Sequence, residues 1–168
     1  MVERGGILFG LFKKKENKLQ IGAPLKGMAI PLQEVSDPTF GEGILGNGMA
    51  IQPEEGKIYA PVDGDVTLLF DTLHAVSITS EDDVEILVHI GLDTVVLKGE
   101  HFIAHTQTGA KVKKGDLLLE VDLEQVKAAG YDVVTPIIIC NTSDYEAVEA
   151  VTGNVVAPGD VILEITKK

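Results

Sequence analysis

Apolar and polar side chains alternate most clearly within residues 72–93. Two short runs rich in Val and Ile, residues 74–79 and 84–89, flank the polar segment Ser80-Glu81-Asp82-Asp83. Runs of this length and composition, separated by a few polar residues, are typical of a β-hairpin. The pattern therefore predicts two antiparallel strands joined by a four-residue loop.

The register of this hairpin decides which side chains are neighbours. If the loop closes symmetrically, Val76 lies opposite Leu87 and His74 lies opposite His89. Directly opposed residues share one face of the sheet, with Cβ atoms roughly 4.5–5.5 Å apart. A slip of one residue would move one histidine to the other face. The symmetrical register predicts two adjacent imidazole rings at the open end of the hairpin.

Short apolar runs at close spacing continue along the rest of the chain, and two of them are repeated. The pattern A-P-x-x-G occurs at residues 23–27 and 60–64, and G-D-[LV]-[LI]-L-E-[VI] occurs at residues 115–121 and 159–165. We interpret the two repeated patterns as evidence of a fused pair of similar β-motifs on one core. Chance similarity between β-turns is the alternative.

Helical signals are few. Asp122 is placed to cap a short turn over residues 123–129 that ends at Gly130, and Ser143-Asp144-Tyr145-Glu146 is a capping box that predicts a short helix to about Val151. Both segments lie between strands and do not alternate with them. We therefore predict an all-β fold, an antiparallel β-sandwich or flattened barrel with short helical turns.

The N-terminal residues differ in composition from the rest of the chain. Within residues 1–19 an apolar run, Ile7–Phe12, precedes Lys13, Lys14 and Lys15. Such a segment could be an amphipathic helix that makes weak contact with an anionic membrane, or a frayed tail. We predict a flexible appendage over residues 1–19 and a single domain over residues 20–168.

Charge and cysteine content limit the classes of partner and compartment. The 168 residues carry a formal net charge of −12, which disfavours nucleic acid as a partner and favours a basic protein or none. The single cysteine, Cys140, ends an apolar run, so we expect it to be buried. No signal peptide or run of ~20 apolar residues is recognisable, so we expect a cytoplasmic protein. The Met1 start and Lys-rich appendage favour a free-standing unit.

The paired histidines allow three kinds of chemistry: metal binding, acid–base catalysis, or acceptance of a transferred group by one ring. His74, His89 and the nearby Asp93 make too few ligands for a stable zinc site. Gly91 lacks a Cβ and would let another molecule's backbone approach. Thr72 could hold the His74 ring in one tautomer. These neighbours favour group transfer, with no metal and no cofactor required.

An apolar surface with acids at its edge is expected around the pair, as on a transient protein-docking face. Its predicted members are Asp37, Phe40, Phe70, Val76, Leu87 and Asp93. The other histidines, His101 and His105, lie in an extended segment and are interpreted as surface residues.

Six segments between about Ile21 and Ile165 form a recognisable set: ILGNGMAIQP, GKIYAPVDGDV, DTLHAVSI, VEILVHIGLDTVVLKGEHF, KVKKGDLLLEVD and TPIIICNTSD. They closely resemble the glucose-type IIA component of the bacterial phosphoenolpyruvate-dependent sugar phosphotransferase system. The resemblance implies an antiparallel β-sandwich and identifies residues 20–168 as a IIA phosphocarrier domain.

The resemblance also implies a role for each site residue. His89 would accept a phosphoryl group on Nε2 from the histidine-containing phosphocarrier protein and pass it to a IIB domain of a membrane sugar permease. His74 would help to deliver the group, Thr72 would orient the His74 ring, and Asp37 and Asp93 would meet an arginine of the carrier. Regulatory target proteins are further expected partners.

Three alternatives remain open on the sequence alone. A biotinyl or lipoyl carrier domain shares APVDG-like turns, but the hairpin tip here lacks the modifiable lysine of that class. A metal-dependent hydrolase would need more ligands than the histidine pair provides. A purely regulatory binding module would use the same face without turnover.

Overall fold

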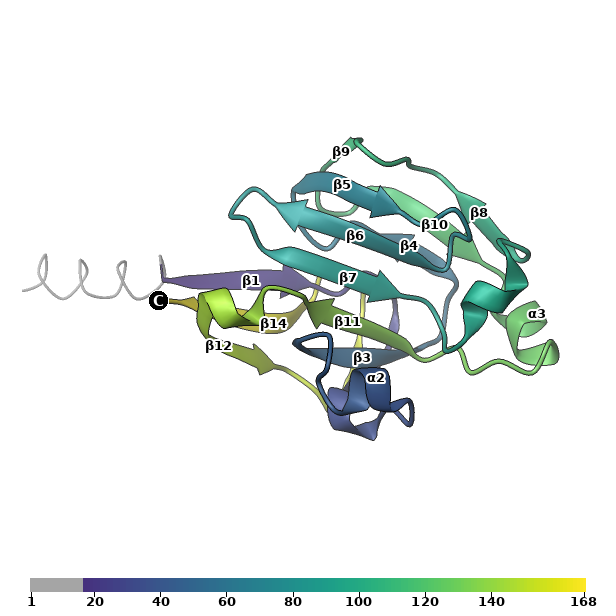
Figure 1. Cartoon of the computed structure of the whole chain (residues 1–168), viewed down its shortest axis with the longest axis horizontal. Helices are drawn as coiled ribbons and strands as arrows, with labels where there is room; N and C mark the ends of the chain where they lie inside the picture. The colour runs from purple at the N-terminus through teal and green to yellow at the C-terminus, as the bar shows by residue number, and fades with distance from the viewer. Residues whose placement is uncertain (1–16) are drawn as a thin grey trace, which may run out of the picture.

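The fold is built almost entirely from antiparallel strands, as the sequence predicts. A computed structural model of the chain describes residues 17–168 (Figure 1). Its strands are β1 (Lys18–Gly22), β2 (Gly27–Pro31), β3 (Asn47–Pro53), β4 (Lys57–Tyr59), β5 (Gly64–Leu69), β6 (Ala75–Ser80), β7 (Glu85–His89), β8 (Phe102–Ala104), β9 (Lys111–Val112), β10 (Leu117–Val121), β11 (Thr135–Ile139), β12 (Tyr145–Ala150), β13 (Val155–Val156) and β14 (Val161–Lys167).

The strands form three sheets. The largest has the order β13-β2-β3-β11-β7-β6-β5-β9, and two smaller sheets have the orders β4-β10-β8 and β1-β14-β12. Figure 1 shows β1, β14 and β12 at one end of the molecule and β8 at the other end. Side chains from all three sheets meet in one main core, so the prediction of a sandwich-like all-β fold is confirmed.

A second, smaller core lies on the outer face of β11 and β3. It contains Phe40, Leu92 and Ile138 among its buried members, and Leu87 packs against it. It is covered by the 3-10 helix η1 (Leu32–Glu34) and by the short helix α2 (Pro38–Gly41). Because β11 is buried on both faces, its sequence is a continuous apolar run and does not alternate.

The predicted hairpin is present as β6 and β7, but the predicted register is wrong by one residue. The Ser80 N–H donates to the Val84 carbonyl (2.9 Å), and Asp83 between them has φ 66°. The loop therefore has three residues with a left-handed residue last, a common hairpin geometry. This register pairs Ala75 with His89 and Val76 with Val88.

The shifted register removes one residue from the predicted docking surface. Val76 pairs with Val88 and lies in the main core with no exposed surface. Leu87, on the opposite face of β7, is half-buried against the second core.

The two repeated sequence patterns occupy equivalent positions in the sheets. The β1–β14 and β2–β13 pairs of one half correspond to the β4–β10 and β5–β9 pairs of the other. The Ala23 N–H donates to the Asp160 carbonyl (2.7 Å), and the Ala60 N–H donates to the Asp116 carbonyl (2.8 Å). Matching strand pairs and matching turn hydrogen bonds support a pair of similar β-motifs over chance similarity of turns.

Of the two predicted helical segments, one is confirmed and one is wrong. Asp122 caps α3 (Leu123–Ala128) by accepting from the Gln125 N–H (3.2 Å), and Gly130 follows with φ 96°. The segment after Ser143 is instead the 3-10 helix η3 (Thr142–Asp144) followed by β12. Pairing of β12 with β14 therefore overrides the local capping signal.

Two further sequence expectations need correction. Cys140 is exposed, because β11 ends at Ile139 and the chain turns there. Residues 18 and 19 belong to β1 and pair with Thr166 and Ile165, so the domain begins earlier than residue 20. The rest of the predicted appendage, residues 1–16, lies outside the described residues. Residues 17–168 contain no helix long and apolar enough to span a bilayer.

The three-residue loop predicts that valine substitutions at Asp83 and Asp82 change the free energy of unfolding by different amounts. Asp83→Val places a β-branched side chain at positive φ, so we expect a loss of about 1–2 kcal/mol in the free energy of unfolding. Asp82→Val serves as the control, because Asp82 is exposed and is not at positive φ; its change should stay within about 0.5 kcal/mol. Urea denaturation measures both, and equal losses would contradict this loop geometry.

Candidate functional site

His89 is the last residue of β7, where the strand leaves the sheet. Its side chain lies on the outer face, opposite to that of Val88, and is partly exposed. Nδ1 of the ring lies 2.8 Å from the carbonyl oxygen of Gly91. Since a carbonyl can only accept, Nδ1 carries the proton and donates. The other nitrogen, Nε2, therefore keeps a free lone pair in the neutral ring.

His74 lies beside His89 even though the register prediction was wrong. The ring centroids are 4.9 Å apart and the ring planes meet at 83°. His74 precedes β6, and Leu73 before it has φ 59° and packs against the main core. This left-handed residue breaks the in–out alternation of the strand. The break lets the His74 ring reach the outer face, although regular alternation would have turned it inward.

Thr72 holds the His74 ring, as the sequence predicts. Its hydroxyl oxygen lies 2.6 Å from His74 Nδ1. When the hydroxyl donates, Nδ1 accepts and Nε2 carries the proton. This is the tautomer in which His74 can donate to a group bound on its neighbour.

Two phenylalanines pack against the histidine pair. The Phe40 ring lies 4.8 Å from the His89 ring, and the Phe70 ring lies 5.4 Å from the His74 ring. Phe40 comes from α2 and Phe70 follows β5. The structure therefore brings together five predicted site residues from three separate parts of the chain, and these aromatic rings limit water access to the imidazoles.

Burial lowers the pKa of both rings. The pKa of His74 falls to about 4, first because the ring is buried and second because it would share its surroundings with the positive charge of His89. Burial also lowers the pKa of His89, and the hydrogen bond to Gly91 and the charges of Asp37 and Asp93 partly oppose this shift. Both rings are therefore neutral at pH 7.

The predicted acids flank His89 from two sides. Asp37 caps α2, where its carboxylate accepts from the Thr39 N–H (3.0 Å). Asp93 is exposed, with φ 60°, at the start of the 3-10 helix η2 (Thr94–Leu97). Both negative charges act on the His89 ring and raise its pKa.

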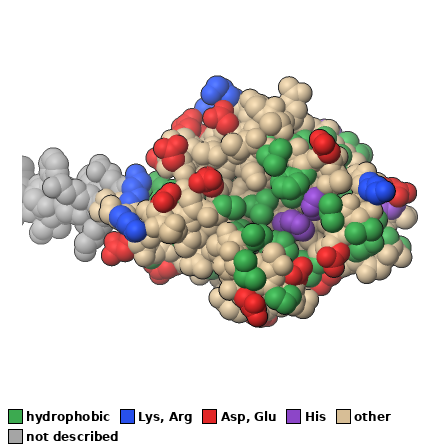
Figure 2. Space-filling view, in the orientation of Figure 1, with side chains coloured by type: hydrophobic (Ala, Val, Ile, Leu, Met, Phe, Trp, Pro, Cys, Tyr) green, Lys and Arg blue, Asp and Glu red, His purple; other side chains and the backbone are tan. Residues whose placement is uncertain are grey.

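Hydrophobic side chains lie beside the histidines on the surface. Figure 2 shows them next to the histidines, with acidic side chains nearby. Three exposed hydrophobic residues not selected from the sequence lie in elements that adjoin predicted site residues in the chain: Leu68 in β5, before Phe70, and Val95 and Val96 in η2, after Asp93.

Gly91 has a different role from the predicted one. It is buried with φ 78°, and a Cβ there would lie 2.6 Å from Thr94 Cγ2 and 2.8 Å from the Asp132 carbonyl oxygen. The missing side chain makes room for this protein's own loop, and the approach of a second molecule is not the reason for it.

The remaining histidines lie apart from the pair. His105 is exposed and its Nε2 contacts Glu120 (2.7 Å), and His101 is half-exposed. Their surface position confirms the prediction. Among residues 17–168, His, Cys, Asp and Glu side chains form no group of three or more that could hold a metal ion.

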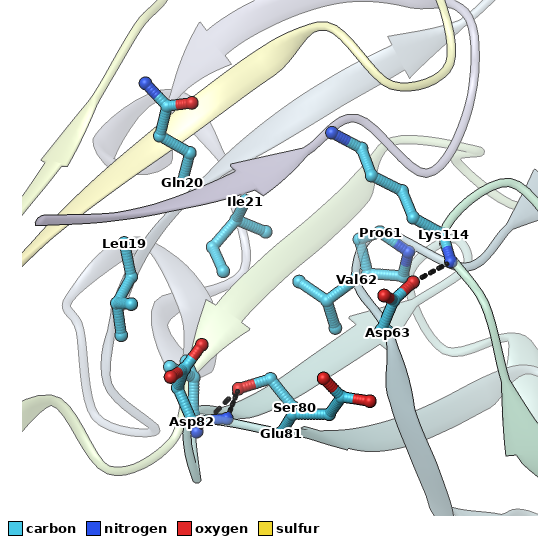
Figure 3. Close-up of a pocket in the computed structure, with 11 residues that line it drawn as sticks. Leu19, Gln20, Ile21, Pro61, Val62, Asp63, Ser80, Glu81, Asp82 and Lys114 are labelled. Atoms are coloured by element: carbon cyan, nitrogen blue, oxygen red, sulfur yellow. Dashed lines mark hydrogen bonds between the residues drawn. The ribbon is translucent and has the colours of Figure 1, made fainter. Parts of the chain in front are cut away.

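A pocket of about 230 Å³ lies at the other end of the hairpin, beside the β6–β7 turn (Figure 3). Its wall combines apolar residues of β1 with acidic residues of the turn. Ser80 in this wall accepts from the backbone of Asp82 (3.2 Å), and Asp63 accepts from the backbone of Lys114 (2.8 Å). No histidine lines it, and its acidic residues Asp63, Glu81 and Asp82 outnumber its one basic residue, Lys114. We therefore place the reactive site at the histidine pair.

The pair is suited to accepting an electrophilic group. His89 offers an unprotonated Nε2 at the surface, its other nitrogen is held by a backbone carbonyl, and a second neutral imidazole stands beside it. His74 is buried, with 4% of its surface exposed, and His89 is partly exposed, so an incoming group reaches the pair through His89.

Comparison with known proteins agrees with this chemistry. Residues 19–145 match the family described as "phosphoenolpyruvate-dependent sugar phosphotransferase system, EIIA 1". The glucose permease IIA from Mycoplasma capricolum has a similar structure, with a TM-score of 0.79 and 38% sequence identity over 88% of this chain and 95% of that chain.

Curated relatives are of two lengths. The glucose-specific EIIA component of Oceanobacillus iheyensis is 40% identical over 153 residues, which cover 91% of this chain and 93% of the relative. The β-glucoside-specific EIIBCA component of Bacillus subtilis is 54% identical over 125 residues, which cover 74% of this chain. The chain spans only 20–24% of the length of the β-glucoside-specific relatives.

The lowered pKa of His74 predicts a pH-dependent stability. Between pH 6.5 and about 4 the unfolded state binds a proton at this residue and the folded state does not, so folding weakens as the pH falls. The wild type should therefore lose up to about 3 kcal/mol relative to His74→Gln across this window. Denaturation of both proteins at pH 7, 5.5 and 4 measures the difference, and a constant difference would contradict the shift.

Proposed function

The chain belongs to the EIIA 1 family of the phosphoenolpyruvate-dependent sugar phosphotransferase system, and given this membership we propose that His89 is its phosphoryl acceptor. Members of this family are phosphoryl-transfer proteins, so the chain is a phosphocarrier domain with transferase activity in sugar uptake. The observation that supports His89 is the hydrogen bond from Nδ1 to Gly91, which leaves Nε2 free.

In the proposed reaction the Nε2 lone pair of His89 attacks the phosphorus of a phosphohistidine on the donor. The new N–P bond forms as the donor's N–P bond breaks, and the donor imidazole leaves with its electron pair. No proton has to leave His89, because Nδ1 keeps its proton and its bond to Gly91. Such a transfer needs positioning and charge stabilisation more than covalent help from the protein.

His74 is proposed to stabilise the charge that arrives. Its Nε2–H can donate to a phosphoryl oxygen on His89, provided that the Thr72 hydroxyl holds Nδ1 as an acceptor. The low pKa of His74 keeps the ring neutral, so it does not repel the positive ring of a phosphorylated His89. The same hydrogen bond would favour onward transfer by holding the phosphoryl group in line with the next acceptor.

The proposed donor is the histidine-containing phosphocarrier protein, and the proposed acceptor is a IIB domain of a sugar permease. Asp37 and Asp93 are placed at the rim to meet a basic side chain of the donor, while Phe40, Phe70 and Leu87 provide the apolar contact. Relatives named EIIBCA support the IIB acceptor, since their name joins the A unit with a B unit. We further propose a cytoplasmic location, no cofactor, and regulatory target proteins that bind the same face.

Phosphorylation of single-site variants tests this proposal. With phosphoenolpyruvate and the general phosphotransferase components, the wild type should take up one acid-labile, alkali-stable phosphate, and His89→Gln should take up none. His74→Gln should be labelled but should pass the group on at least about 100-fold more slowly, because the oxygens lose their donor. Purified IIB domains of glucose and β-glucoside permeases serve as acceptors.

A matched control is the exposed His105→Gln, which changes a histidine outside the site and should behave like the wild type. Full labelling of His89→Gln would refute the assignment of the acceptor.

A further inference from the structure

Thr94 is a buried polar residue close to the site. It has no exposed surface, and its hydroxyl donates to the carbonyl of Ile90 (2.5 Å). Asp93, directly before it, has a left-handed backbone and makes no side-chain capping bond to η2. The hydroxyl of Thr94 is thus the side-chain group that ties the start of η2 back to the end of β7.

This bond belongs to a frame around the loop that carries Gly91. The Ile90 N–H donates to the His74 carbonyl (2.7 Å), while the Ile90 carbonyl accepts from Thr94. On the other side of Gly91, the Leu92 N–H donates to the Asp132 carbonyl (3.0 Å). The peptide group before Gly91 is therefore held by Thr94, and the peptide group after it is held by Asp132.

The same residues also enclose the α-carbon of Gly91. A Cβ at Gly91 would meet the Thr94 methyl group on one side and the Asp132 carbonyl on the other. Asp132 is in turn fixed, because its carboxylate accepts from the Val134 N–H (2.9 Å). The Gly91 carbonyl belongs to the peptide group that the Leu92 N–H ties to Asp132, and Thr94 holds the peptide group before it. Between these two anchors the carbonyl accepts from His89 Nδ1.

We propose that Thr94 is a positioning residue for phosphoryl transfer, which acts by holding the Gly91 carbonyl in the orientation that keeps the proton of His89 on Nδ1. The inference rests on the proposed function of His89, because the value of the tautomer lies in the free Nε2. Thr94 is not itself a catalytic residue, since its hydroxyl bonds to the backbone and to neither ring. A purely structural threonine would contribute to stability without affecting the imidazole.

The test compares Thr94→Val with Thr94→Ser. Valine keeps the shape and removes the hydroxyl, whereas serine keeps the hydroxyl. In protein labelled with ¹⁵N-histidine at pH 7.5, we expect the wild type and Thr94→Ser to show His89 protonated on Nδ1. In Thr94→Val the ratio of the two tautomers should shift by about fivefold toward the Nε2-protonated form, as expected for loss of one net hydrogen bond.

Phosphoryl uptake provides the second readout. The initial rate of labelling of Thr94→Val should fall on the order of 10- to 100-fold, since a displaced nucleophile is costly, and Thr94→Ser should restore it to within a few-fold. The control is Thr142→Val, which removes a similar bond from a threonine hydroxyl to the Ile139 carbonyl (2.6 Å) near the opposite end of β7. Thr142→Val should lose stability but keep both the tautomer and the rate.

The outcomes are distinguishable. A wild-type tautomer in folded Thr94→Val, or the same shift in Thr142→Val, would overturn the positioning role. If Thr94→Val does not fold, hydrogen exchange of the wild-type Thr94 hydroxyl proton provides the test. We expect this proton to exchange slowly with water, and fast exchange would overturn the proposal. If Thr94→Val shifts the tautomer but wild-type His89 takes up no phosphate, the proposed function is refuted, and Thr94 is left only with control of the His89 tautomer.

Discussion

The hydrogen bond between His89 Nδ1 and the Gly91 carbonyl is the constraint on which the site depends. A neutral imidazole has one proton and one lone pair, and the carbonyl decides which nitrogen holds which. The reactivity proposed for His89 follows from that choice, because the proposed acceptor nitrogen, Nε2, must carry the lone pair. A side chain could make the same bond, but a backbone carbonyl does not titrate and holds the ring at any cellular pH.

The fold supplies rigidity where this bond needs it. β7 ends at His89 while its inward side chains, including Val88, are buried in the main core, and β11 beside it is covered on both faces. Phe40 from α2 packs against the His89 ring, and Phe70 after β5 packs against the His74 ring. The same burial that lowers the histidine pKa values keeps both rings neutral and ready to accept or donate.

The fold class, the hairpin and the closeness of His74, His89 and Thr72 were predictable from sequence, whereas backbone conformations at single positions were not. The register failed because Asp83 adopts a left-handed conformation that alternation cannot reveal, and Val76 moved into the core as a result. The two histidine rings are nevertheless neighbours. A second left-handed residue, Leu73 before β6, turns the His74 side chain toward His89 and so offsets the shift in register. Thr94 lies in the segment VEILVHIGLDTVVLKGEHF, but the sequence does not show that its hydroxyl donates to the Ile90 carbonyl, just after β7.

The position of the phosphoryl group on the phosphorylated protein is the most direct measurement of the central claim. NMR spectra that correlate ³¹P with ¹⁵N-labelled histidine identify the nitrogen that carries phosphorus. We expect phosphorus on Nε2 of His89, with Nδ1 still protonated and bonded to Gly91. Phosphorus on Nδ1 of His89, or on His74, would contradict the role given to the backbone carbonyl.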